Sequence, residues 1–399
     1  MVVAAPRTVG AVTLTGDQAG HVWNWILARQ GLHPEQRLSS VAEIADAGLG
    51  IHAARLPSPF ATVLARAASP NIAMTLLTPL EGMTTLRCMR KTLHLLPLDL
   101  AAIAHAATAR YRLRDAARMA VNAGVSRPAL ARATQQLTEL LAEGALPVRQ
   151  IEAALTDRST PVSTVRVALK AAWEQGALTY LNQSGCWNAE RRAFALTADI
   201  HPGLDVARDP GGATRELVRA YFLRYGPATL RDATWWSALS RSAVAAALGA
   251  AEVAWLEVTT PWCAAPAYMA AAQYEQFLAA DAATFATGLN LLAHEDVALK
   301  AYFETRGRYL AGLPSDRAFN QIGEALPTLL VDGHVQGTWR WDPAGRAVRP
   351  MLARDRASRL LLRRVSSAAE TLTDALRAGS RGRRPRPVFP RPDQLALIY

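Results

Sequence analysis

Three times along this sequence, a run of short amphipathic helices is followed by β-prone segments. In the first copy, helices are predicted over 15–31 and 39–49, and two more begin near Pro57 and Pro70. A hairpin is predicted over 84–97, where two alternating segments flank a polar turn. Helices followed by a hairpin form a winged-helix unit, so the chain is expected to be mainly α-helical with β-hairpins.

The second and third copies repeat this order without repeating the sequence. The second is predicted to hold helices near 113–123, 127–143, 148–155 and 161–175, then a hairpin over 177–196. The third is predicted to hold helices over 214–225, 230–237 and 240–249, then an extended segment over 253–258. A segment rich in Pro, Gly and Asp over 199–212 marks the linker between these two copies.

The last part of the chain has a different character. A hairpin is predicted around the Asp332-Gly333 turn, a helix follows over 366–378, and the end is rich in Arg and Pro. We therefore predict three winged-helix units, a C-terminal β domain and a basic tail, with the limits 1–110, 111–200, 201–282, 283–379 and 380–399.

The charge of the chain favours a polyanionic partner. The formal net charge is +11 over 399 residues, which indicates nucleic acid or an acidic membrane face. Only three of the 44 basic residues are lysines, so part of this excess is typical of a GC-rich genome. Five of the arginines lie in the last twenty residues, which leaves a positive folded body.

The cysteines and the apolar segments exclude other classes of protein. Cys88, Cys186 and Cys263 have no CxxC spacing, which argues against a zinc site or a disulfide framework and fits a reducing cytoplasm. The apolar run 243–258 is interrupted by Glu252 and is too short for a membrane helix. We expect a cytoplasmic protein that needs no metal, no cofactor and no membrane.

Four segments in order resemble the AlkZ/YcaQ-like family of winged-helix DNA glycosylases. Residues 47–54 are similar to that family's Gly-Leu-Gln-Ala-Gln loop, and 90–95 to its Arg-Gly-Thr-Leu-His-Leu wing. Residues 231–239 and 330–340 resemble its third unit and its closing strand pair. The resemblance implies tandem winged helices with a small C-terminal β-barrel-like domain that clamp DNA. It also implies removal of bulky alkylated bases, including self-resistance against DNA-alkylating antibiotics.

The resemblance places the catalytic motif at His52-Ala53-Ala54. The family has Gln or His in the first position and Gln in the last, so His52 can act whereas Ala54 cannot form side-chain hydrogen bonds. Further candidates follow in the acidic segment His294, Glu295 and Asp296. The alternatives are an ordinary core or loop histidine and a solvated helix start, and Glu43 is expected on the surface.

The chemistry suits such a motif. An N7- or N3-alkylated purine already carries a positive charge, so it can leave without being protonated. The enzyme must hold a water molecule against C1′ and stabilise an oxocarbenium-like sugar, and a neutral imidazole can orient that water.

Basic side chains are candidates for DNA contacts. Phosphates attract cations on wings and along helix faces, although a solvated charged surface has the same pattern. Trp235 and Trp236 are expected to be core anchors. The predicted DNA-binding residues are Arg55, Arg87, Arg90, Lys91, His94, Arg166, Lys170 and Arg340.

The sequence therefore predicts a monomeric glycosylase that hydrolyses the N-glycosidic bond of a bulky alkylated purine in duplex DNA. The alternative is a non-catalytic protein that binds DNA or the adduct, which Ala54 favours. A transcription regulator ranks third, since the three units are dissimilar and show no dimerisation signature.

Overall fold

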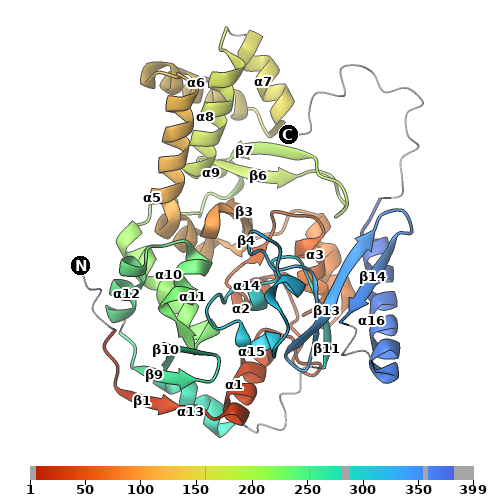
Figure 1. Ribbon diagram of the computed structural model, residues 1–399. Coiled ribbons are helices and arrows are strands. Elements are labelled where there is room, and N and C mark those ends of the chain that lie inside the picture. The colour runs from red at the N-terminus through yellow and green to blue at the C-terminus, as the bar shows by residue number, and fades with distance from the viewer. Residues whose placement is uncertain (1–5, 158, 251, 281–287, 354–357, 382–399) are drawn as a thin grey trace.

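The computed structural model describes residues 6–157, 159–250, 252–280, 288–353 and 358–381. In Figure 1 the helices of residues 127–174 lie at the top, those of 210–249 at the left, and the strands of 334–352 beside the helix of 359–378 at the right. The long helix α5 (Leu98–Asn122) reaches from the middle of the molecule to α6 (Arg127–Leu141), α7 (Val148–Asp157) and α8 (Val162–Glu174).

The first copy has the predicted order of helices and hairpin. Its three strands form a sheet in the order β2-β4-β3, and a 3-10 turn over Met89–Lys91 joins the two strands of the hairpin. The elements are α2 (Val41–Ala47), β2 (Ile51–His52), α3 (Ser58–Leu64), α4 (Pro70–Met74), β3 (Met83–Arg87) and β4 (Leu93–Pro97).

The second copy follows the same order. Its sheet has the corresponding arrangement, β5-β7-β6, and α5 packs against its helix α8. The elements are α6 (Arg127–Leu141), β5 (Leu146–Pro147), α7 (Val148–Asp157), α8 (Val162–Glu174), β6 (Leu178–Asn182), β7 (Arg192–Leu196) and the short α9 (Thr197–Ile200).

The third copy repeats the order and adds a strand from the other end of the chain. Strand β1 (Gly10–Thr13) pairs in parallel with β9, which gives a four-stranded sheet in the order β1-β9-β10-β8. The elements are α10 (Pro210–Tyr225), β8 (Ala228–Thr229), α11 (Leu230–Ser237), α12 (Arg241–Gly249), β9 (Trp255–Thr260), β10 (Cys263–Ala270) and α13 (Ala271–Ala279).

The C-terminal part is an antiparallel sheet in the order β11-β12-β13-β14. The amphipathic helix α16 packs on β14 and β11 (Figure 1). The elements are β11 (Leu289–Leu292), α14 (Val297–Lys300), α15 (Gly307–Leu310), β12 (Thr328–Val331), β13 (His334–Asp342), β14 (Ala347–Leu352) and α16 (Arg359–Ala378).

Local sequence signals account for where most helices begin. The hydroxyl of Thr15 accepts from the backbone of Gln18 in a capping box that starts α1 (Gly16–Arg29). The Ser40 side chain accepts from the backbone N–H of Glu43 at the start of α2, and that of Ser69 from the backbone N–H of Asn71 at the start of α4, where Pro70 occupies the first turn as predicted.

The cores show which parts fold together. The second copy has an apolar cluster of its own, with Leu137, Ile151 and Val165 at its centre. A second cluster joins the first copy to the C-terminal sheet and α16, and a third joins α1, α5 and the third copy. The indole N–H of Trp23 on α1 donates to the carbonyl oxygen of Gly333 at 2.7 Å, which ties the N-terminal helix to the β12–β13 turn.

The structure differs from two expectations about domains. The predicted first unit begins at residue 1, but β1 does not pack with that unit, because this strand completes the sheet of the third copy. The C-terminal sheet is not closed, since no pairing between β11 and β14 is found in the residues described. The limit at 283 and the tail from 382 onward lie outside those residues. None of the described helices is long and apolar enough to cross a membrane.

Candidate active site

His52 lies on the two-residue strand β2, directly opposite His94 of β4. Its side chain is 3% exposed. The chain enters β2 through Gly50, whose φ of +101° and whose closeness to Leu96 leave no room for a Cβ atom. The Tyr225 hydroxyl donates to the carbonyl oxygen of Gly48 at 2.6 Å, so the loop before His52 is held by the third copy.

Three histidines from distant parts of the sequence meet here. The ring centroid of His52 lies 5.8 Å from that of His94 and 6.2 Å from that of His294, which follows β11. The Nδ1 atom of His52 is buried and has no hydrogen-bond partner in the part of the chain that the structure describes. A buried polar atom of this kind requires a ligand or a water molecule.

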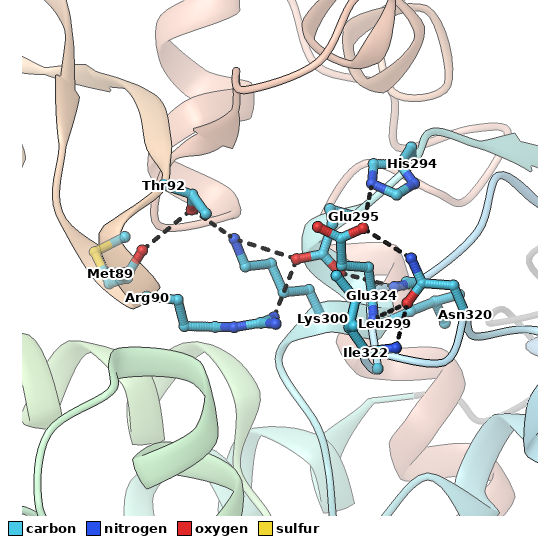
Figure 2. A network of polar contacts seen from close by, with 12 residues as sticks. Met89, Arg90, Thr92, His294, Glu295, Leu299, Lys300, Asn320, Ile322 and Glu324 are labelled. Carbon is cyan, nitrogen blue, oxygen red and sulfur yellow. Dashed lines mark hydrogen bonds and ion pairs between the residues drawn. The ribbon is translucent and has the colours of Figure 1, made fainter. Parts of the chain in front are cut away.

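A buried ion network lies next to the histidines, and Figure 2 shows its members Arg90, Glu295 and Lys300. Lys300 Nζ lies 3.0 Å from Nε2 of His94 and 3.7 Å from Oε2 of Glu295. The same Oε2 accepts a hydrogen bond from Arg90 at 3.0 Å, and the other carboxylate oxygen accepts from the backbone N–H of Ala325 at 2.7 Å. Both oxygens of Glu295 are therefore engaged.

Burial and nearby cations keep the imidazoles neutral. Burial lowers the pKa of His52 far below its ordinary value, and the charge of Lys300 lowers it further. The same two causes hold the pKa of His94 well below its usual range. Burial also lowers the pKa of Lys300 to about 8, against the opposing effect of Glu295. His52 is thus a hydrogen-bonding group without charge.

The exposed edge of the site carries a second carboxylate. Oε2 of Glu324 accepts from Arg55 at 2.9 Å and from Asn320 at 2.8 Å, and it lies 3.5 Å from Nε2 of His294. The Glu324 side chain is 18% exposed, whereas that of Glu295 is 2% exposed. Glu324 is the carboxylate of this site that water can reach.

Two members of the site were missed by the sequence analysis. Glu324 belongs to no recognisable motif. Lys300 carried a signal, because it is one of only three lysines in the chain and it ends the otherwise apolar run 297–300. A lysine in such a run is expected to be buried and paired.

Asp296, predicted as a catalytic candidate, instead has a structural partner. Its two oxygens receive a bidentate pair of hydrogen bonds from Arg66 at 2.7 and 2.8 Å, and both side chains are fully buried. One of these oxygens also caps α14 at the backbone N–H of Ala298. The alternative interpretation of this segment, a solvated helix start, therefore does not hold for Asp296. Glu43, by contrast, is exposed and bonds to Ser39.

Several cations predicted to contact DNA are held by protein carboxylates. Glu174 is almost fully buried and pairs with Arg87 from β3, Arg112 from α5 and Lys170 on its own helix. Lys91 pairs with Asp115.

The other predicted DNA contacts lie in different environments. A phosphate contact by His94 does not fit the structure, because its side chain is 2% exposed and faces Lys300. Arg90 is mostly covered and stacks over Trp235 at 4.2 Å. Arg55 and Arg166 are 56% and 54% exposed although each is paired, and Arg340 is exposed on β13.

Comparisons with known proteins find a family and a solved structure that this chain resembles. The family model described as "DNA glycosylase AlkZ-like" matches residues 49–378. The structure is similar to that of the Streptomyces sahachiroi DNA glycosylase AlkZ, with a TM-score of 0.69 and 21% identity over 91% of this chain and 97% of that one. No curated protein sequence matches the chain. Because the family model spans His52 and the whole network around it, the chain belongs to the AlkZ-like DNA glycosylase family.

Proposed function

We propose that this glycosylase hydrolyses the N-glycosidic bond of bulky N7- or N3-alkylated purines in duplex DNA. The observation that carries the proposal is the buried, neutral His52, whose Nδ1 has no protein partner among the residues described. A neutral acceptor beside carboxylates suits a substrate that already carries the positive charge.

In this reaction the bond between C1′ and the purine nitrogen breaks, and its electron pair neutralises the purine cation. The sugar is left with oxocarbenium character. The oxygen of a water molecule bonds to C1′ and loses one proton, which gives the free alkylated purine and an abasic site. No general acid is needed, because the leaving group departs as a neutral base.

His52 orients the attacking water in this mechanism. The water donates a hydrogen bond to the free imidazole nitrogen, and His94 and Lys300 fix the ring from behind. Glu324 is the reachable carboxylate, so we assign to it the stabilisation of the sugar cation and the uptake of the water's proton. Glu295 and Asp296 hold Lys300, Arg90 and Arg66 in place.

The architecture supports binding to duplex DNA. We infer that each copy is a winged helix. In all three sheets, the short strand that precedes the other helices pairs with the last strand of the hairpin. The exposed Arg55, Arg166 and Arg340 would contact phosphates. The proposal extends to a role in self-resistance against a DNA-alkylating natural product, which the motif resemblance of residues 47–54 and 90–95 implies.

The test is single-turnover release of the damaged base from a duplex with one N7-alkylguanine. His52→Ala is expected to lower the rate roughly a hundredfold, as for the loss of a water-positioning group. His52→Gln should retain much of the rate, because an amide oxygen can accept the same hydrogen bond.

A different result would favour the second candidate function. Ala54, exposed in the motif position where relatives have glutamine, is the observation that favours a non-catalytic adduct-binding protein. If the native protein binds the damaged duplex but releases no base from simple or bulky adducts, the glycosylase mechanism fails and the binding function takes its place.

A further inference from the structure

A cavity of about 350 Å³ lies next to the candidate active site. It is bounded by the start of α3, the turn between β6 and β7, and the end of β13. His294 lines it and also faces His52, so the two sites share one side chain. Arg55 lines its rim and follows the His52-Ala53-Ala54 motif directly.

Three tryptophans give this cavity an aromatic wall. Trp187 and Trp341 meet edge to face, with ring centroids 5.2 Å apart. The indole N–H of Trp187 donates to the carbonyl oxygen of Leu376 at 2.6 Å, and that of Trp339 to the carbonyl oxygen of Leu292 at 2.8 Å. The planes of these two rings are therefore fixed before any ligand arrives.

The polar groups of the cavity are few. The Ser58 side chain is 1% exposed, and its hydroxyl oxygen has no hydrogen-bond partner within the described part of the chain. Arg340 lies at the rim and is exposed. An apolar, aromatic cavity with one free hydroxyl and a cationic rim fits a planar neutral group attached to a phosphate-bearing chain.

We propose that this cavity binds the aromatic appendage of a bulky alkylated purine, while the purine itself lies at His52. The proposal rests on the proposed function and names its substrate class: adducts whose alkyl group carries an aromatic ring. The ring stacks on the partly exposed indole of Trp341, which Trp187 and Trp339 support from the core. Ser58 hydrogen-bonds to a polar substituent, and the rim arginines contact neighbouring phosphates. A volume of 350 Å³ is large enough for a substituted aromatic ring.

The test compares two duplexes, one with a single N7-methylguanine and one with a single N7-benzylguanine. Trp341→Ala is expected to lower kcat/KM and weaken Kd for the benzyl adduct about tenfold, the usual loss when an aromatic stacking partner is removed. Both constants for the methyl adduct should stay unchanged. Trp341→Phe, which keeps a ring, should restore most of the benzyl preference.

The possible outcomes separate this proposal from the proposed function. Equal losses on both adducts, or no loss on either, would overturn the aromatic subsite while leaving the glycosylase mechanism intact. If no base is released from either duplex, the glycosylase mechanism fails. The aromatic subsite is then tested by Kd alone. It is overturned if the native protein binds the benzyl duplex no more tightly than the methyl duplex.

Discussion

At the scale of single residues, the site depends on keeping His52 uncharged. His52 and His94 are buried against Lys300 and Arg90, and the carboxylate of Glu295 pairs with both cations. Protonation of either ring would add a further charge to a network already rich in positive charge. The residue that we propose to orient water is therefore also a source of pH sensitivity in folding.

We expect the free energy of unfolding to fall as the pH drops below about 6.5. Unfolded histidines bind protons there, whereas His52 and His94 remain neutral in the folded chain because their pKa values are lowered. Each of the two histidines should lower the free energy of unfolding by about 1 kcal/mol per pH unit between pH 6 and pH 5. Urea unfolding at several pH values measures this loss. His52→Gln should reduce the slope, and an unchanged slope would contradict a neutral His52; the exposed His21→Gln is the control.

Glu324 should be the carboxylate on which the rate depends. Glu324→Gln removes the charge beside His294 and is expected to lower single-turnover base release at least tenfold. Glu304→Gln is a matched control, since that side chain is similarly exposed at 23% and also pairs with an arginine, Arg231. Equal rates for the two variants would show that Glu324 only positions Arg55.

At the scale of elements, ion pairs join segments that are far apart in the chain. Arg66, just after α3, and Asp296, at the start of α14, form a fully buried bidentate pair. This pair fixes the segment that carries His294, Glu295 and Lys300 against the unit that carries His52. Glu174 has a similar role for the second copy, because it binds cations from β3, α5 and α8.

Breaking the Arg66–Asp296 pair should be costly. Arg66→Met leaves a buried carboxylate without a counter-charge and is expected to lower the free energy of unfolding by about 3 to 5 kcal/mol. Adding Asp296→Asn should recover a large part of this loss, since the double variant buries no charge. Urea unfolding of both variants measures the difference. A double variant no more stable than the single one would contradict the cost of an unpaired buried charge, since asparagine can still cap α14.

At the scale of the whole molecule, the positive charge divides into two groups. Some cations serve internal pairs, as Arg87 and Lys170 do, while others stay exposed. The count of 44 lysines and arginines therefore overstates the number of side chains available to phosphates. Affinity for DNA should depend on the exposed group alone.

Salt dependence distinguishes the two groups. Arg340→Ala is expected to lower the slope of log Kd against log salt concentration by about one, the share of one phosphate contact. Arg87→Ala should change that slope little, because this guanidinium is 25% exposed and pairs with Glu174. Fluorescence anisotropy with an undamaged duplex at four salt concentrations measures both. The same reduction for both variants would contradict this division.

Local signals in the sequence determined most of the elements. Capping side chains and Pro residues fixed the starts of α1, α2 and α4, and alternating segments fixed the hairpins, because these effects act within a few residues. The motif around His52 was readable for the same reason. The sequence thereby specified the order of helices and hairpins, and it named His52, His294 and Glu295 as candidates for the site.

Tertiary structure alone decided how these parts meet. Nothing local distinguishes β1 as the edge strand of the third copy, since its partner lies about 245 residues away. Packing of the core pairs Asp296 with Arg66 and places His94 beside Lys300. It leaves Glu324 as the carboxylate that water can reach. A charged side chain pairs with the opposite charge that folding brings within a few ångströms of it. The spacing of the two residues in the sequence does not determine that distance.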